Sequence, residues 1–286
     1  MPDRMILPKN FSPAISIVIP AKNEALNLEV ILRELPPVHQ VILVDGDSVD
    51  DTIETAMRVM PGIEIIRQTR TGKGNALACG FAAVTGDIVV MFDADGSADP
   101  AEIPSFVATL IAGADVAKGS RFRPGGGSED ITLFRRVGNL GLNALTNLML
   151  GTHYTDLCYG YNAFWADILP ELDLPDTSLP AHGDGRMHWG DGFEIETVLT
   201  CRMAAARLDV REVASIERLR IFGASNLNAI SDGFRVLKTI ITERDRVPAV
   251  ARAAATTRID IDHSAAITRI DVDHSASQIQ LPARSA

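Results

Sequence analysis

Short runs of aliphatic and β-branched residues alternate with helix-forming segments through residues 15–118 of this chain. The runs lie at residues 15–19, 41–44, 63–66, 87–92 and 115–118. Between them, apolar residues recur every three or four positions, which is the spacing of one face of an α-helix. Strands that alternate with such helices form βαβ units, in which parallel strands are joined by right-handed crossovers. The alternation predicts an α/β fold, with a mostly parallel sheet flanked by helices.

The second half of the chain is less regular. We expect helices over residues 140–150, 193–206 and 232–244, a strand over 159–165, and a loop over 175–190. The pattern of 193–206 is typical of an amphipathic helix, and the leucines of 140–150 are expected to pack onto the sheet. Core packing is also the expected role of the aromatic residues within 159–165.

The composition shifts to Ala, Ser and Thr after about Arg252, and residues 257–267 are repeated almost unchanged as 268–278. Two copies of a short polar repeat are too few to build a solenoid core. We therefore expect one domain over 13–250, divided into halves at 13–122 and 123–250, and an appended low-complexity tail over 251–286.

Bulk properties exclude several classes of protein. The net charge of −10 argues against non-specific nucleic-acid binding, which depends on Lys and Arg at the phosphates. The three cysteines have no CxxC spacing, which favours reduced thiols and a cytosolic setting. The start of the chain lacks the apolar core of a signal peptide, and no apolar run approaches the ~20 residues of a membrane span. We expect a cytoplasmic protein whose closest approach to a membrane is peripheral contact at its inner face.

Polar clusters follow four of the predicted strands. They occupy residues 20–24, 45–51, 70–75 and 93–99. Ligands of parallel α/β sheets bind beyond the carboxyl ends of the strands, so these clusters should converge on one site.

The triplet Asp93-Ala94-Asp95 directly follows a buried strand, and strand alternation places both carboxylates on the same side. Two such oxygen donors can share a Mg²⁺ or Mn²⁺ ion that also binds a diphosphate. The ion would neutralise the charge that develops on a departing nucleoside diphosphate. An Asp-x-Asp alone is a weak signal that is better explained as a turn with a helix cap, but its position among three other polar loops favours the functional interpretation.

Other strand ends supply candidates for the rest of a nucleotide site. Asp45 can accept from a base N–H or a ribose hydroxyl, and Pro20 and Glu24 would close the base pocket. The segment 72–74 (Gly-Lys-Gly) opens a helix with small residues and one cation, Lys73, which suits a diphosphate cradle without matching a P-loop.

Two residues of the predicted loop over 175–190 and its continuation are further candidates. His188 lies three residues before Asp191, and it is a candidate third metal ligand, although a lone His is more often structural. Asp191 could serve as general base for a hydroxyl acceptor. A phosphate acceptor is already ionised near neutral pH and needs no base.

The ordered set of motifs resembles family 2 glycosyltransferases of the GT-A fold, and within them the enzymes that act on dolichol phosphate and bacterial polyprenyl phosphates. The motifs lie at residues 15–24, 45–52, 72–74, 93–100, 119–122, 156–165, 193–196, 217–220 and 223–226. The resemblance spans about residues 13–246, and it makes 13–122 the nucleotide-sugar half and 123–250 the acceptor half. Two departures are Gly46, at a usually acidic position, and Ser97, where these mannosyltransferases have Gln.

The resemblance implies a role for each matching residue. Pro20, Ala21, Glu24 and Asp45 would contact the nucleoside. The metal and the diphosphate would be bound by Asp93, Ala94 and Asp95. Arg121 and Arg220 would bind phosphates of the donor or the acceptor. It implies inverting transfer from a UDP- or GDP-sugar to a polyprenyl phosphate. A soluble hydroxyl acceptor, either a metabolite or a glycan, remains the alternative, since the membrane span of many relatives is missing.

Two other classes of protein fit the pattern less well. A sugar-nucleotide pyrophosphorylase would need a glycine-rich signature after the first strand, where this chain has Pro-Ala-Lys-Asn-Glu at 20–24. A non-catalytic nucleotide-sugar binder would have no need of the intact pair Asp93 and Asp95.

Overall fold

The computed structural model describes residues 11–223 and 229–244. The repeated tail predicted over 251–286 and the residues after Gly223 in the 223–226 motif lie outside the described residues.

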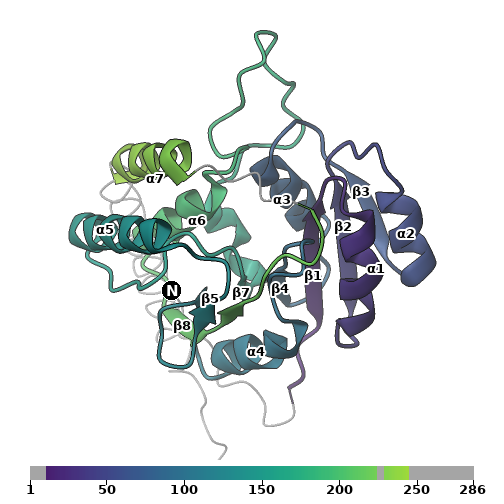
Figure 1. Cartoon of the computed structure of the whole chain (residues 1–286), viewed down its shortest axis with the longest axis horizontal. Helices are drawn as coiled ribbons and strands as arrows, with labels where there is room; N and C mark the ends of the chain where they lie inside the picture. Colours follow the sequence, from purple (N-terminus) through teal and green to yellow (C-terminus); the bar gives the residue numbers. More distant parts are fainter. Residues whose placement is uncertain (1–10, 224–228, 245–286) are drawn as a thin grey trace, which may run out of the picture.

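A seven-stranded sheet forms the centre of the molecule (Figure 1), with strand order β3-β2-β1-β4-β7-β5-β8. Every neighbouring pair is parallel except those that involve β7, which runs antiparallel to β4 and β5. The mostly parallel α/β sheet predicted from the sequence is thus confirmed. Its strands are β1 (Ile15–Ala21), β2 (Gln40–Asp45), β3 (Glu64–Arg67), β4 (Ile88–Met91), β5 (Val116–Ser120), β7 (Asn162–Trp165) and β8 (Val210–Ala214); β6 (Gly127–Ser128) and β9 (Ile216–Glu217) form a separate pair.

Helices cover both faces of the sheet. The bounds are α1 (Ala25–Glu34), α2 (Thr52–Val59), α3 (Lys73–Ala82), η1 (Pro100–Glu102), α4 (Ile103–Ile111), α5 (Leu133–Leu150), η2 (Ala166–Leu172), α6 (Ile195–Ala205) and α7 (Ala229–Arg244). Strand alternation sends Ile17 and Ile19 into one core, which α1 and α4 complete, and Val18 into the other, which α3 and α6 complete. The helices α5 and α7 lie outside α6, away from the sheet.

Two expectations for the second half are wrong. The helix α6 is buried around almost its whole circumference and is not amphipathic, because η2 and α7 pack on it in addition to the sheet. The helix α5, which contains 140–150, packs against α6 and α7, and its Leu140 and Leu148 are exposed, so these two leucines do not pack onto the sheet. The aromatic residues of 159–165 are buried in the core as expected.

Candidate active site

The loops after β1 and β2 are braced against each other at the carboxyl edge of the sheet. The backbone N–H of Asn23 donates to Ser48 Oγ at 2.9 Å, and that of Glu24 donates to Thr52 Oγ1 at 2.9 Å. Asp45 is buried at the end of β2, where both its carboxylate oxygens accept from the Ser48 N–H at 3.3 Å. The parallel register places Ala21 opposite Asp45. Four predicted nucleoside contacts, Pro20, Ala21, Glu24 and Asp45, are therefore gathered at one edge.

The triplet that contains Asp93 and Asp95 follows β4 immediately. Ala94 is buried and holds the turn against the core, while both acidic side chains remain partly exposed. Asp95 Oδ1 accepts from the backbone N–H of Ser97 at 3.0 Å and from its hydroxyl at 2.7 Å. Ser97 thus orients the second carboxylate.

A distant segment, residues 218–222, crosses this edge of the sheet (Figure 1). Its backbone is bound to the acidic loop, because Arg218 N–H donates to Ser97 O at 2.8 Å and Ile221 N–H donates to Asp95 O at 3.2 Å. Gly96 allows this close approach, since its φ is +79° and an added Cβ would lie 2.5 Å from Ile221 Cδ1.

Arg220 projects from the crossing segment between two of the predicted site residues. Its Nη1 lies 2.9 Å from Glu24 Oε1, and its Nη2 lies 3.1 Å from Asp95 Oδ2. The structure therefore brings Arg220 together with the first and fourth strand ends.

Lys73, at the start of α3, forms ion pairs with Asp93 Oδ1 at 2.8 Å and with Glu196 Oε1 at 2.6 Å. Burial disfavours the charge of Lys73, but the two carboxylates outweigh this effect and raise its pKa. Glu196 was not predicted as a site residue. The only signal for it was its place in the 193–196 motif, because nothing in the spacing connects it with a lysine 123 positions earlier.

The close packing around this lysine also explains Gly160. A Cβ at that position would lie 3.2 Å from Asp93 Oδ2 and 3.4 Å from both Lys73 Nζ and Glu196 Oε1. A glycine here leaves space directly beside the first carboxylate of the triplet.

The charges of this group suit a divalent cation. Four carboxylates (Glu24, Asp93, Asp95 and Glu196) share two cations (Lys73 and Arg220), so the fully ionised group has a formal net charge of −4 + 2 = −2. Burial raises the pKa of Asp93 more than its pair with Lys73 lowers it, and the neighbouring Asp95 and Glu196 raise it further. Mg²⁺ and Mn²⁺ prefer hard oxygen ligands, and the carboxylates of Asp93 and Asp95 are ligands of this kind.

The glycines of the 72–74 segment have a different role from the one predicted. An added Cβ at Gly72 would lie 2.1 Å from Asp191 O, and one at Gly74 would lie 1.8 Å from Gly190 O. The Asn75 N–H also donates to Asp191 O at 3.1 Å. Close packing of the 190–192 backbone explains these glycines, and this backbone covers part of the predicted diphosphate cradle.

Asp191, the candidate general base, is buried and paired. Its Oδ2 lies 2.6 Å from Arg70 Nε, and its Oδ1 accepts from Arg70 Nη2 at 2.9 Å. Arg70 also donates to the carbonyls of Asp176 and Leu179, at 2.9 and 2.8 Å. In this arrangement the pair ties the 173–194 segment to α3, and Asp191 does not present an oxygen to an acceptor.

His188 is not brought to the acidic triplet. Its Nε2 lies 2.9 Å from Pro180 O, and its ring lies 4.0 Å from that of His182. Both histidines belong to the segment that projects beyond α3 and α6 in Figure 1. Across residues 11–223 and 229–244, no three His, Cys, Asp or Glu side chains form a metal-binding group. The prediction of His188 as the third ligand beside Asp93 and Asp95 does not fit this geometry.

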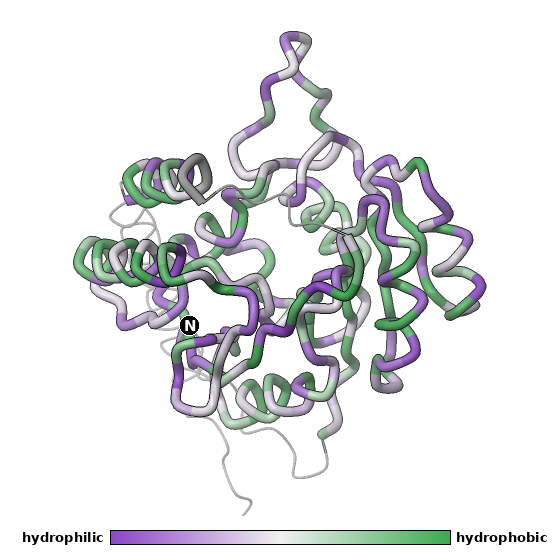
Figure 2. Tube along the Cα trace, in the orientation of Figure 1, coloured by the Kyte–Doolittle hydropathy of each residue, from purple (hydrophilic) through white to green (hydrophobic). Residues whose placement is uncertain are grey.

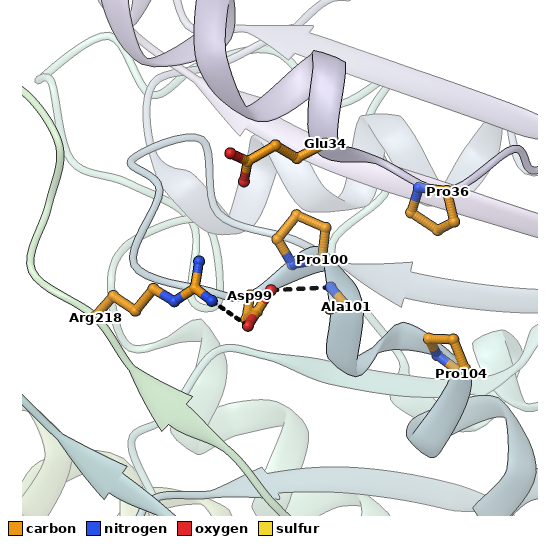
Figure 3. A pocket seen from close by; sticks show the side chains of 7 residues that line it. All are labelled: Glu34, Pro36, Asp99, Pro100, Ala101, Pro104 and Arg218. Atoms are coloured by element: carbon orange, nitrogen blue, oxygen red, sulfur yellow. Dashed lines mark hydrogen bonds and ion pairs between the residues drawn. The ribbon is translucent and has the colours of Figure 1, made fainter.

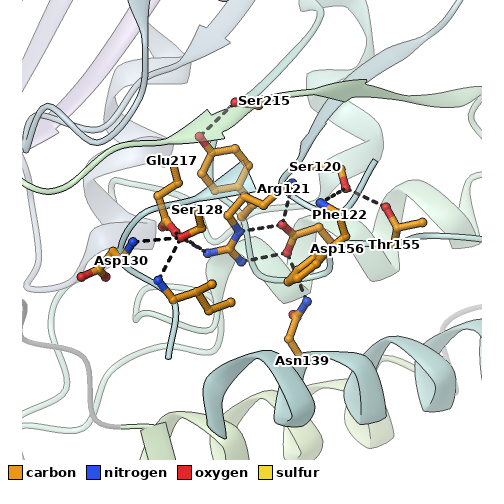
Figure 4. Close-up of polar contacts among 12 residues, drawn as sticks. Ser120, Arg121, Phe122, Ser128, Asp130, Asn139, Thr155, Asp156, Ser215 and Glu217 are labelled. Carbon is orange, nitrogen blue, oxygen red and sulfur yellow. Dashed lines mark hydrogen bonds and ion pairs between the residues drawn. The ribbon is translucent and has the colours of Figure 1, made fainter. Parts of the chain in front are cut away.

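Arg121 lies in a buried network (Figure 4). Its guanidinium donates to Asp156 Oδ2 at 2.7 Å and Oδ1 at 2.9 Å, and it lies 3.0 Å from Glu217 Oε2. These carboxylates outweigh the effect of burial and raise the pKa of Arg121. Glu217 precedes Arg220 by three residues, so Arg121 anchors the crossing segment. A contact between Arg121 and a phosphate, as predicted, would require these pairs to open.

A pocket of about 500 Å³ lies between the end of α1 and the start of α4 (Figure 3). Asp99 and Arg218 form an ion pair in its wall, and three prolines, Glu34 and Ala101 line the rest. It contains none of the predicted nucleoside or metal contacts. Within the described part of the chain, no helix is long and apolar enough to cross a membrane.

The sequence is similar to that of a known family and of several relatives. Residues 16–173 match the family model described as Glycosyl transferase family 2. An uncharacterized glycosyltransferase of Mycobacterium bovis is 39% identical over 108 residues, which are 38% of this chain and 49% of that relative. The chain thus spans about half the length of that curated relative. An undecaprenyl-phosphate mannosyltransferase of Micrococcus luteus is 31% identical over 212 residues, which are 70% of this chain and 83% of that protein.

Solved structures share the fold. Glucosyl-3-phosphoglycerate synthase from Mycobacterium tuberculosis, in complex with Mn²⁺, uridine diphosphate and phosphoglyceric acid, superposes with a TM-score of 0.62 at 23% sequence identity. The match covers 82% of this chain and 79% of the synthase. This likeness concerns the architecture, in which a GT-A sheet is flanked by helices.

Proposed function

The chain belongs to glycosyl transferase family 2, and on this premise we propose that it is an inverting, metal-dependent enzyme that transfers a sugar from a UDP- or GDP-sugar to a polyprenyl phosphate. The observation that carries the proposal is the position of Arg220 between Glu24 and Asp95, beside the ion pair of Lys73 with Asp93. Residues from the nucleoside side, the metal side and the acceptor half meet there.

Asp93 and Asp95 would hold a divalent ion together with donor phosphate oxygens, since Mg²⁺ sites commonly combine one or two carboxylates with substrate phosphates. When bound, such an ion stabilises the negative charge of a departing nucleoside diphosphate. Asp45, with Pro20 and Ala21, would fix the nucleoside. The Arg220 guanidinium would donate charge-assisted hydrogen bonds to the phosphate oxygens.

The surroundings of the carboxylates favour an acceptor that needs no base. Asp191 is buried against Arg70, and Glu196 is paired with Lys73. A phosphate oxygen is already anionic near neutral pH and can attack the sugar without losing a proton. The undecaprenyl-phosphate mannosyltransferase relative, which aligns with 70% of this chain, supports the same class of acceptor.

The alternative acceptor is a soluble hydroxyl compound. The synthase structures show that this fold accommodates a soluble acceptor, but their likeness to this chain extends to architecture alone. Because a polyprenyl phosphate resides in a membrane, the proposed function places the enzyme at the cytoplasmic face of a bilayer.

A transfer assay tests the proposal. The purified chain is incubated with Mn²⁺ or Mg²⁺, one nucleotide sugar at a time, and a polyprenyl phosphate in detergent. We expect a glycosyl phosphate lipid that is cleaved by mild acid but survives mild base, formed from one of the UDP- or GDP-sugars, and no product in EDTA. Transfer to hydroxyl compounds such as phosphoglycerate, with none to the lipid phosphate, would overturn the acceptor assignment.

A further inference from the structure

The helix α5 is oriented with its apolar side toward solvent. Leu133, Val137, Leu140 and Leu148 lie on one face at helical spacing, and Leu133 and Leu148 are 78% and 83% exposed. Figure 2 shows this helix as largely hydrophobic at the periphery of the molecule. An amphipathic helix of a globular protein ordinarily directs this stripe at the core.

The inner face of α5 is polar for a specific reason. Asn143 Nδ2 donates to Thr155 O at 2.6 Å, and Asn147 Nδ2 donates to Tyr154 O at 2.8 Å. One turn earlier, Asn139 Nδ2 lies 3.5 Å from Asp156 Oδ1. These asparagines satisfy the buried groups of the 154–156 loop, so the apolar face must point outward.

The neighbouring helix α7 adds to this surface. It packs against α5, and its Phe234 is 69% exposed, with Ile241 also exposed. We define the outer α5–α7 surface by its exposed members, which are Leu133, Phe134, Arg136, Val137, Leu140, Leu148, Phe234, Lys238, Ile241 and Arg244. An exposed apolar area of this kind marks an interaction site.

The charges of this surface are of one sign. Within residues 133–150 and 233–244, every exposed charged side chain is Arg or Lys, and the acidic Glu243 is buried in its pair with Arg202. The chain as a whole has a net charge of −10, so a basic area on it is selective for an anionic partner. Exposed leucine and phenylalanine side chains beside basic residues are typical of helices that lie in a membrane interface.

We propose that the outer α5–α7 surface docks the enzyme on an anionic lipid bilayer. A second copy of the chain fits less well, because a two-fold interface would set the same basic area against itself. The proposal deepens the proposed function and rests on it in one respect, namely the reason for docking, which is access to a lipid acceptor.

A chain of contacts joins the docking surface to the candidate active site. Asn139 on α5 contacts Asp156, Asp156 pairs with Arg121, and Arg121 pairs with Glu217. Figure 4 shows these contacts as far as Glu217, which lies three residues before Arg220 in the sequence. The helix that contacts the bilayer is therefore braced against the segment that supplies Arg220 to the site.

Vesicle flotation tests the proposal. The full chain is mixed with vesicles of phosphatidylcholine alone or of phosphatidylcholine with phosphatidylglycerol, and we expect binding to the anionic vesicles. The variant Phe134→Glu/Leu148→Glu should lower the partition coefficient at least about tenfold, since it replaces interfacial apolar side chains by charges. Arg136→Gln/Arg244→Gln should lower it by about fivefold per removed charge on the anionic vesicles.

The matched control is Leu26→Glu, which changes a leucine of α1 that is 65% exposed but lies outside this surface. It should bind vesicles as the wild type does. Equal loss in the control, or no binding of the wild type to anionic vesicles, would overturn the docking surface. Dimerisation of the wild type in sedimentation equilibrium, abolished by Phe134→Glu/Leu148→Glu, would assign the surface to a second copy.

The two proposals fail separately. Vesicle binding without transfer to any detergent-solubilised polyprenyl phosphate would leave the docking surface standing and remove the proposed acceptor. Transfer in detergent without vesicle binding would leave the proposed acceptor standing and remove the docking surface.

Discussion

Arg220 and Asp95 are 125 residues apart in the chain and 3.1 Å apart between Nη2 and Oδ2. The contact joins the second half of the chain to the acidic triplet, and the second arm of the same guanidinium reaches Glu24. Under the proposed function, Arg220 would act from this position on the donor phosphates, on the acceptor, or on both.

Arg220→Ala should reduce sugar transfer by about a hundredfold or more, as does the loss of one preorganised donor at a reacting anion. Mn²⁺ binding without donor, followed by electron paramagnetic resonance, should be as tight as in the wild type or tighter, because the cation that competes for Asp95 is gone. Arg220→Lys is the control for charge alone. Weakened Mn²⁺ binding with unchanged transfer would contradict the assigned role.

Asp95→Asn should abolish transfer while the fold is retained. An asparagine Oδ1 can still accept the Ser97 hydrogen bonds, and the lost pair with Arg220 is partly exposed, so the free energy of unfolding should change by less than about 1 kcal/mol. EDTA should inactivate the wild type, and Mn²⁺ or Mg²⁺ should restore it. Full activity in EDTA would refute metal dependence.

Asp191→Asn should act mainly on stability. The substitution leaves the buried Arg70 guanidinium without the carboxylate that pairs with it, and breaking such a pair costs about 3–5 kcal/mol. Chemical denaturation measures this loss, and Arg70→Met/Asp191→Leu should recover part of it. A general base would behave differently: the variant would keep its stability and lose the acidic limb of the pH profile of kcat/KM.

Two glycine substitutions should change stability in opposite directions. Gly74→Ala sets a Cβ at 1.8 Å from Gly190 O, which forces the backbones apart and should cost about 1–3 kcal/mol or more. Gly138→Ala, within α5, meets nothing within 4 Å and should stabilise the protein by about 0.5–1 kcal/mol through helix propensity. Thermal unfolding of the two variants checks this contrast, and a neutral Gly74→Ala would contradict the close packing.

Burial raises the pKa of the Cys158 and Cys201 thiols to about 12. At pH 8 only about one thiol in ten thousand would be ionised, so both cysteines should resist alkylation until the protein is unfolded. A raised pKa in the folded state stabilises the protein below the unfolded value near 9.0, and this stabilisation is lost as the pH rises toward 12. The loss of stability between pH 9 and 12 should be smaller in Cys158→Ala than in the wild type. Rapid labelling of the native protein at pH 8 would refute the assignment.

Much of the architecture could be predicted because it is encoded locally. The apolar runs at 15–19 and 41–44 need burial on both faces, which only a central strand provides, and β1 and β2 are the result. Strand ends in a parallel sheet share one edge, so Asp45 and Asp93 had to lie on the same side of the molecule. The sequence alone therefore determined the α/β class and the edge of the sheet at which the candidate site lies.

Tertiary structure decided which charges meet. Lys73 was predicted to contact a diphosphate, but in the structure it is paired with Asp93 and Glu196, and Asp191 is paired with Arg70. The orientation of α5 could not be predicted either, because its leucines have the spacing of a helix that faces the core. In the structure its asparagine face is buried instead, since these asparagines donate hydrogen bonds to the 154–156 loop. Periodicity states only that one face of an element differs from the other. The buried face of α5 is decided by a loop that the chain folds back onto it. The pairs Lys73–Glu196 and Arg70–Asp191 join residues more than a hundred positions apart, which only the folded chain brings within hydrogen-bonding distance.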